Sequence, residues 1–279
     1  MFRDIAVAVF AVDADEPAIA AAEAIAAKSD ADLTAVLLEL EPDPVYTMEG
    51  VMVSSLWAEV LAGAHKGFAK EKTALEARAK RGARPFAVRE MMAAAGLAPG
   101  GAAVAARHAD LTIMLRPGGA PVADYRRAVF ESVLFSSGRP VLLVPPDWRA
   151  GAIGRKVAVA WNGKREAARA LGDAAPLLEE ADEIVVITVD AKPDANGVGS
   201  VPGADICAHL ARRGLKVELR NLDGMGRPDA DTLIAGAEAW GADLLVMGGY
   251  GRARVREMVF GGVTRAVVDT APLPVFMSH

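Results

Sequence analysis

The chain has 279 residues, of which 52% are hydrophobic and 24% are charged, and its formal net charge at pH 7 is −5. This composition predicts a packed globular protein of one large or two ordinary domains and excludes extensive disorder. The negative charge argues against general nucleic-acid binding. The sequence contains no uninterrupted apolar run of about 18 residues, so no membrane span is predicted.

The cysteine content and the first residues predict a cytoplasmic protein. Cys207 is the only cysteine, so the chain cannot form an internal disulfide, which fits a reducing compartment. The apolar N-terminus carries Asp4 almost at its start, and Asp13, Asp15 and Glu16 interrupt it soon afterwards. Such early acids are not typical of an export signal.

The first half of the sequence alternates short apolar runs with helical segments. The expected strands cover residues 5–10, 33–38, 85–88, 109–115 and 140–144, and the expected helices cover 15–28, 99–107 and 123–135. A longer segment extends from a proline-marked loop at 41–44 to about Arg81, where Gly82 is a plausible helix terminator. Continuous apolar strands that alternate with helices predict a parallel sheet covered on both faces.

The second half repeats the first in the same order after a linker at 145–151. The triplet Ala109-Asp110-Leu111 recurs letter for letter as Ala242-Asp243-Leu244, and four further segments match. An internal duplication is the most economical explanation. We therefore expect domains at 1–147 and 153–279, each an α/β unit with a doubly wound, parallel, five-stranded sheet, packed as a pseudo-dimer. The last strand of each copy would be an edge strand that needs covering or pairing.

A glycine-rich turn follows the expected strand at 244–248. Gly248, Gly249 and Gly251 lie at its start, and nine residues separate Gly251 from the pair Gly261-Gly262. Consecutive backbone N–H groups in such a turn, beside a helix N-terminus, suit a phosphate group. A tight strand-to-helix turn that binds nothing would have the same pattern, so the residues alone leave both interpretations open.

These residues resemble the universal stress protein family, in a tandem form that covers nearly the whole chain. The family pattern is Gly-x-x-Gly, nine residues, then Gly followed by Ser or Thr, and Gly248, Gly251 and Gly261 match it. A second similar stretch is 157–171, which opens the second copy. The resemblance implies a Rossmann-like fold and a stress-response protein, and family members divide into those that bind ATP and those that do not.

For a binder, the resemblance implies a nucleotide at the carboxyl ends of strands one, two and four of the second copy, where ligands of open α/β sheets usually lie. It assigns the contacts to Trp161, Asn162, Val189, Met247, Gly248, Tyr250, Gly251, Gly261, Gly262, Val263 and Thr264. The strand ends would meet the nucleoside, and the glycines would line the phosphates. The implied cofactor is ATP, with Mg²⁺ as its accompanying ion.

Several positions depart from the family pattern. Asn162 stands where binders carry an acid, and Trp161 is bulky enough to stack on a base or to block it. Gly262 replaces the expected hydroxyl residue, although Thr264 keeps a hydroxyl two positions later. In the first copy the segment aligned with Gly261-Gly262 is Arg127-Ala128, so we expect no nucleotide there.

Three function classes follow from these observations. The first is adenine-nucleotide binding or sensing by the second copy, without fast turnover. The second is a nucleotide-free scaffold that acts through dimerisation or partner binding. The expected assembly is a homo-oligomer or an intrachain pseudo-dimer. The third, an enzyme of the adenine-nucleotide α-hydrolase group, is disfavoured because its loop motifs are missing from the sequence. We therefore predict no catalytic residue, and the four histidines do not have a metal-ligand spacing.

Overall fold

The computed structural model describes residues 1–41, 54–82, 84–94, 98–118, 123–149, 151–193, 201–250 and 262–279. The N-terminal half contains β1 (Asp4–Val9), α1 (Glu16–Ser29), β2 (Asp32–Glu41), α2 (Ser54–Arg81), β3 (Ala87–Ala94), α3 (Ala98–Ala106), β4 (Leu111–Leu115), α4 (Ala123–Ser136) and β5 (Val141–Val144). The C-terminal half contains β6 (Lys156–Ala160), α5 (Arg165–Asp173), α6 (Ala175–Leu178), β7 (Glu183–Val189), α7 (Ala204–Ala211), β8 (Val217–Leu222), α8 (Asp229–Trp240), β9 (Leu244–Gly248), α9 (Gly262–Thr270) and β10 (Val275–Ser278).

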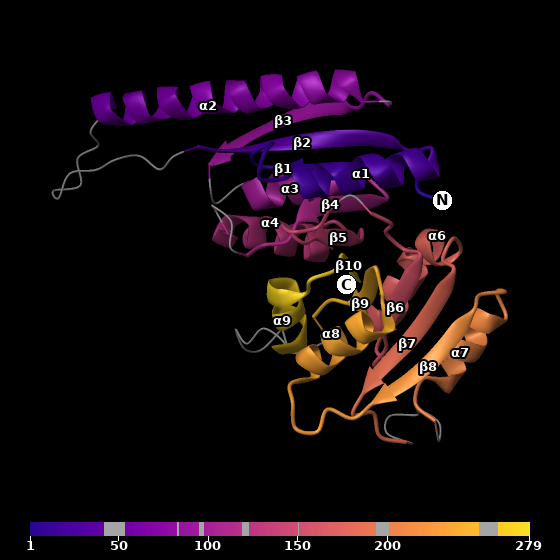
Figure 1. Ribbon diagram of the computed structural model, residues 1–279. Coiled ribbons are helices and arrows are strands. Elements are labelled where there is room, and N and C mark those ends of the chain that lie inside the picture. Colours follow the sequence, from indigo (N-terminus) through magenta and orange to yellow (C-terminus); the bar gives the residue numbers. More distant parts are fainter. Residues whose placement is uncertain are drawn as a thin grey trace.

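The described strands form one ten-stranded sheet in the order β3-β2-β1-β4-β5-β10-β9-β6-β7-β8 (Figure 1). Pairing is parallel within each half, and the halves join where β5 and β10 pair antiparallel, with Leu142 opposite Phe276. The predicted doubly wound α/β fold is confirmed, and so is the expected need of the last strands for a partner. The two predicted sheets are continuous because each edge strand satisfies the free backbone groups of the other.

The repeated Ala-Asp-Leu triplet performs the same structural task in both halves. The Asp110 carboxylate accepts hydrogen bonds from the backbone N–H groups of Arg3 (2.7 Å) and Asp4 (3.2 Å), where β1 begins. The Asp243 carboxylate accepts from Gly154 (2.8 Å) and Lys156 (3.2 Å), where β6 begins. Each aspartate thus fixes the first strand of its half beside the fourth, which supports the interpretation of a duplication.

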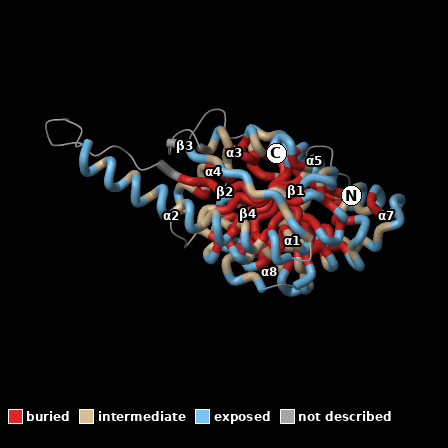
Figure 2. Tube along the Cα trace, turned by 90° about the horizontal axis from the view of Figure 1, so that it is seen from above, coloured by how far each residue is buried: buried red, intermediate tan, exposed pale blue. Residues whose placement is uncertain are grey.

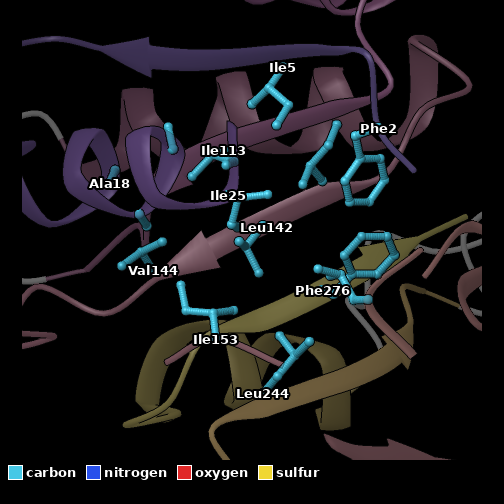
Figure 3. Packing of buried hydrophobic residues seen from close by; sticks show 14 of the residues in the cluster. Phe2, Ile5, Ala18, Ile25, Ile113, Leu142, Val144, Ile153, Leu244 and Phe276 are labelled. Carbon is cyan, nitrogen blue, oxygen red and sulfur yellow. The ribbon is translucent and has the colours of Figure 1, made fainter. Parts of the chain in front are cut away.

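Helices cover both faces of the sheet. One core cluster lies between the sheet and α1, α2, α5, α6 and α7, and the other lies between the sheet and α3, α4, α8 and α9. The first cluster crosses the junction of the halves, where Leu142 and Phe276 lie close to Ile153 (Figure 3). The buried strands are continuously apolar because helices pack on both faces, as the sequence predicted.

The segment that distinguishes the halves is the 28-residue helix α2. Its C-terminal part is anchored, since Leu75 and Ala79 are buried and Arg78 Nε donates to Glu23 Oε1 at 3.0 Å. Its N-terminal part extends away from the body of the protein (Figure 2). In the described residues, no helix combines the length and apolar character that a membrane span requires.

Strands β2 and β3 are longer than the sequence predicted. We expected them to end at residues 38 and 88, but they pair in parallel from Thr34–Ala87 to Glu41–Ala94. The apolar pattern failed here because β3 is an edge strand and carries polar side chains. Glu90, for example, forms a 2.5 Å ion pair with Lys72 of α2.

Candidate functional site

A cavity of about 450 Å³ lies at the carboxyl ends of β6, β7 and β9 in the C-terminal half. Its lining comprises Ala160, Trp161, Asn162, Gly163, Lys164, Glu166, Ile187, Thr188, Val189, Ala191, Lys192, Pro202, Gly203, Asp229, Leu233, Met247, Gly248, Gly262, Val263 and Thr264. The volume falls in the range of about 300–1,000 Å³ that is typical of small-molecule sites. Eight of the eleven residues that the sequence singled out line this cavity.

Helix N-termini surround the cavity because helices of a parallel sheet begin where its strands end. Residues from the first turns of α5, α8 and α9 line it, namely Glu166, Asp229 and Gly262 with its two successors, and so does Gly203, the N-cap residue of α7. Each N-terminus presents backbone N–H groups without intrahelical partners and a partial positive charge. The cavity therefore has the backbone electrostatics of an anion site.

The loop after β6 is fixed by its own hydrogen bonds. The Trp161 N–H donates to the carbonyl of Ile187 at 2.9 Å and so continues the pairing with β7. The Asn162 Oδ1 accepts from the Lys164 N–H at 3.0 Å, a side-chain turn that leads into α5. The half-buried Trp161 packs against the first core cluster, and Asn162 is exposed at the cavity.

Gly248 is required by packing as well as by the shape of the cavity. A Cβ atom placed on it would lie 2.5 Å from the backbone nitrogen of Ala167 and 2.5 Å from the carbonyl carbon of Glu166. Any side chain here would separate β9 from α5. The close approach of strand and helix thus explains this glycine without a ligand.

Tyr250 lies outside the cavity. It has a positive φ of 46° and is 3% exposed, and its ring packs 5.0 Å from the ring of Phe135 in α4 of the N-terminal half. Its N–H donates to Thr264 Oγ1 at 3.2 Å. The structure thus brings Tyr250 to the junction of the halves instead of to the nucleotide position that the resemblance implies.

The start of α9 leaves open space on the cavity side. A Cβ atom on Gly262 would meet no atom within 4 Å, and the residue is exposed. Val263 is half-buried and Thr264 is buried, its hydroxyl accepting the bond from the Tyr250 N–H. The predicted phosphate contacts Gly251 and Gly261 lie outside the described residues.

Charged residues of both signs line the cavity, and the sequence analysis did not select them. Lys164 and Lys192 supply cations, and Glu166 and Asp229 supply carboxylates. Burial has the largest effect on the pKa of Glu166 and raises it. The hydrogen bond from Arg165 Nε (2.7 Å), a backbone hydrogen bond and the charges of Arg165 and His279 together outweigh burial, so the pKa lies below its usual value. The lysines follow the first and second strands of the half, and this placement is the signal that could have identified them.

In the N-terminal half, the equivalent place is filled by side chains. Arg126 of α4 forms an ion pair with Asp15, and their side chains are 1% and 0% exposed. The Asp15 carboxylate also accepts from the N–H of Phe10 at 2.7 Å, and the Arg126 guanidinium lies 4.5 Å from the centre of the Phe10 ring. Phe10 is the counterpart of Trp161 in the duplication, so Arg126 closes the end of β1 that stays open in the C-terminal half.

Among the described residues, no cluster of three or more His, Cys, Asp or Glu side chains could hold a metal ion.

The comparisons with known proteins agree with the fold. Residues 154–279 match the model of the universal stress protein family. The chain is 18% identical to a universal stress protein from Archaeoglobus fulgidus DSM 4304, with a TM-score of 0.70 over 99% of this chain and 95% of that one.

A functionally unknown protein from Pseudomonas aeruginosa PAO1 is 16% identical, with a TM-score of 0.55 over 99% of this chain and 92% of that chain. At these sequence identities, the similarity to the two solved structures shows a shared fold. No curated protein matches the chain.

Proposed function

Because residues 154–279 belong to the universal stress protein family, we propose that the C-terminal half binds an adenine nucleotide, with ATP as the expected ligand, and that binding occurs without fast turnover. The observation that carries the proposal is the cavity at the ends of β6, β7 and β9, surrounded by helix N-termini. The N-terminal half would bind no nucleotide, because Arg126 and Asp15 occupy the corresponding place.

The residues of the cavity suggest one orientation of the ligand. The phosphates would lie over the start of α9, where Gly262 leaves open space and the helix offers free N–H groups. Lys164 and Lys192 would add positive charge at the same cavity. The base would lie toward Val189 and Trp161, whose ring offers a stacking surface.

The sequence contains no recognised motif for hydrolysing a bound nucleotide. The sequence lacks the Gly-x-x-x-x-Gly-Lys-(Ser/Thr) motif that holds phosphates in many nucleotide hydrolases. Phosphoryl transfer also depends on a Mg²⁺ held in place beside the phosphates. We therefore propose a binding or sensing role, in which ATP occupancy is the signal.

The second candidate is a nucleotide-free scaffold, and two observations favour it. Two acidic residues, Glu166 and Asp229, line the cavity, and their negative charges would disfavour phosphates there. The Thr264 hydroxyl is already engaged by the Tyr250 N–H. A scaffold would use the same fold to present a surface to a partner, and its cavity would hold no ligand.

Mass spectrometry of small molecules released from the purified, denatured protein separates the two candidates, together with a thermal shift measured with ATP. Nucleotide binding predicts an adenine nucleotide in the extract or a rise in melting temperature with ATP. Gly262→Val should abolish that rise while the protein stays folded, since a Cβ atom at this position meets no atom within 4 Å.

The matched control is Gly100→Val, an exposed glycine in the first turn of α3 whose Cβ would also meet nothing within 4 Å. This variant should respond to ATP like the wild type. No released nucleotide and no ATP response in the wild type would favour the scaffold.

A further inference from the structure

We infer that α4 and Arg116 of the N-terminal half position the start of α9, which is the end of the cavity where we place the phosphates. The inference rests on the proposed nucleotide site. Its basis is that the chain entering the glycine-rich segment and the helix leaving it are each held by side chains of the N-terminal half. We call these two sets of contacts the first grip and the second grip.

The first grip holds Gly249 and Tyr250, directly after β9. Leu134 of α4 lies so close to Gly249 that a Cβ atom there would be 2.8 Å from its Cδ2. The Phe135 ring packs 5.0 Å from the Tyr250 ring and 4.7 Å from the ring of His279, whose Nδ1 lies 3.0 Å from the Gly249 carbonyl oxygen. The backbone at this point is thus fixed from the N-terminal half.

The second grip holds Asp269, near the C-terminus of α9. Arg127 of α4 forms an ion pair with its carboxylate, and Arg116, after β4, donates a hydrogen bond to its backbone carbonyl. Cations at this end of a helix complement its dipole and its free carbonyl groups. Burial lowers the pKa of Arg116, against the opposing effect of Asp269.

Both grips restrain α9. The hydrogen bond from the Tyr250 N–H to Thr264 Oγ1 connects the first grip to the first turn of α9. Asp269 follows Gly262 by seven residues, so the second grip holds the helix about 10 Å from the end that lines the cavity. A helix held at one end and connected at the other has little freedom to tilt, which keeps its N–H groups aimed at one point.

The grips are related by the duplication. The sequence offset that carries Ala109 onto Ala242 also carries Arg116 onto Gly249, and the offset of the last strands carries Phe135 onto Asp269. The contact of Arg116 with Asp269 is therefore the pseudo-symmetric counterpart of the packing of α4 against Gly249. This reciprocity is the pattern of an isologous interface.

The second grip can be tested without unfolding the chain. The side chains of Arg127 and Asp269 are 23% and 34% exposed, and ion pairs this exposed contribute little to stability. The antiparallel pairing of β5 with β10 and the shared core still join the halves. The effect of Arg127 should therefore appear in ligand binding more than in the unfolding midpoint.

The experiment measures dissociation constants for ATP and for adenosine by titration calorimetry in the full chain. Arg127→Ala should weaken ATP binding about three- to tenfold and leave adenosine within about twofold, because only the phosphates depend on α9. Arg127→Lys should restore part of the loss. The control is Arg139→Ala, which removes an arginine that pairs with Asp110 within the N-terminal half.

Equal affinity for ATP in Arg127→Ala and the wild type, or an equal loss for ATP and adenosine, would overturn the inference. A second measurement separates it from the proposed function. Hydrogen exchange of the amides of α9 in the ligand-free protein should be faster in Arg127→Ala than in Arg139→Ala. A wild type that binds neither ligand would refute the proposed function, and unchanged exchange would refute the positioning role independently.

Discussion

Arg126 and Asp15 form a buried ion pair between α4 and the residue before α1, 111 positions apart in the sequence. The pair closes the N-terminal half at the place where the C-terminal half has its cavity. Asp15 also accepts from the N–H groups of Phe10 and Ala11, at 2.7 and 3.0 Å. The two halves thus differ. In the N-terminal half these charges close the end of β1, whereas in the C-terminal half the ends of β6, β7 and β9 line a cavity.

Arg126→Met should lower the free energy of unfolding by about 3–5 kcal/mol, because it leaves the Asp15 carboxylate buried without its cation. Urea unfolding followed by circular dichroism measures this loss. The control is Arg139→Met, whose arginine and partner Asp110 are 45% and 35% exposed and 3.8 Å apart. Its cost should stay below about 1 kcal/mol. Equal costs for the two variants would contradict the assignment of the buried pair.

Gly248→Ala should destabilise the protein by about 1–3 kcal/mol through overpacking of β9 against α5. The clash is with backbone atoms of Glu166 and Ala167, which no rotamer change can relieve. Gly172→Ala is the control, an exposed glycine in α5 whose added Cβ meets nothing within 4 Å. It should be neutral or stabilising by up to about 1 kcal/mol. Thermal unfolding of both variants measures the difference in stability. A Gly248→Ala protein as stable as Gly172→Ala would refute the close approach of β9 to α5.

Thr264→Val should weaken ATP binding and cost about 1–3 kcal/mol of stability, because the buried N–H of Tyr250 loses its acceptor. Thr270→Val makes the same change at an exposed position of the same helix, where the hydroxyl donates to the Ala266 carbonyl. Calorimetry with ATP and chemical unfolding should separate the two variants. If both behave like the wild type, the hydroxyl of Thr264 does not hold the backbone at Tyr250.

Tyr125 should make stability fall at high pH. Burial raises its pKa to about 12, whereas an unfolded tyrosine has a pKa of about 10. Between these values the folded protein holds the proton more tightly than the unfolded chain, so the free energy of unfolding decreases as pH rises. Tyr125→Phe keeps the ring that packs edge-on at 5.7 Å from Phe10 and should reduce this decrease. Urea midpoints measured from pH 9 to 12 test it, and parallel curves for variant and wild type would contradict it.

The sequence predicted the fold well because the strands are buried on both faces and the duplication gives each of them twice. The sequence indicated that the last strand of each half needs covering or pairing, but it did not predict that β5 and β10 pair with each other, or that they do so antiparallel. The ends of β2 and β3 were wrong because edge strands such as β3 tolerate the polar residues Arg89 and Glu90, which blur the apolar pattern.

The site was predictable only in outline. Strand ends and the glycine pattern located the cavity, because the ends of parallel strands meet at one edge of the sheet. The pairing of Arg126 with Asp15 and the packing of Tyr250 on Phe135 depend on residues more than 100 positions apart. No local pattern encodes such contacts, so they could not be found without the structure.

The central claim is that one nucleotide binds per chain, in the C-terminal half. Titration of the 279-residue chain with ATP in a calorimeter tests it most directly, with Gly262→Val as the variant that blocks the proposed phosphate position. We predict a stoichiometry of one ATP per chain for the wild type and loss of the binding heat for Gly262→Val. Absence of binding to the wild type, a stoichiometry of two, or unchanged binding to Gly262→Val would contradict the claim.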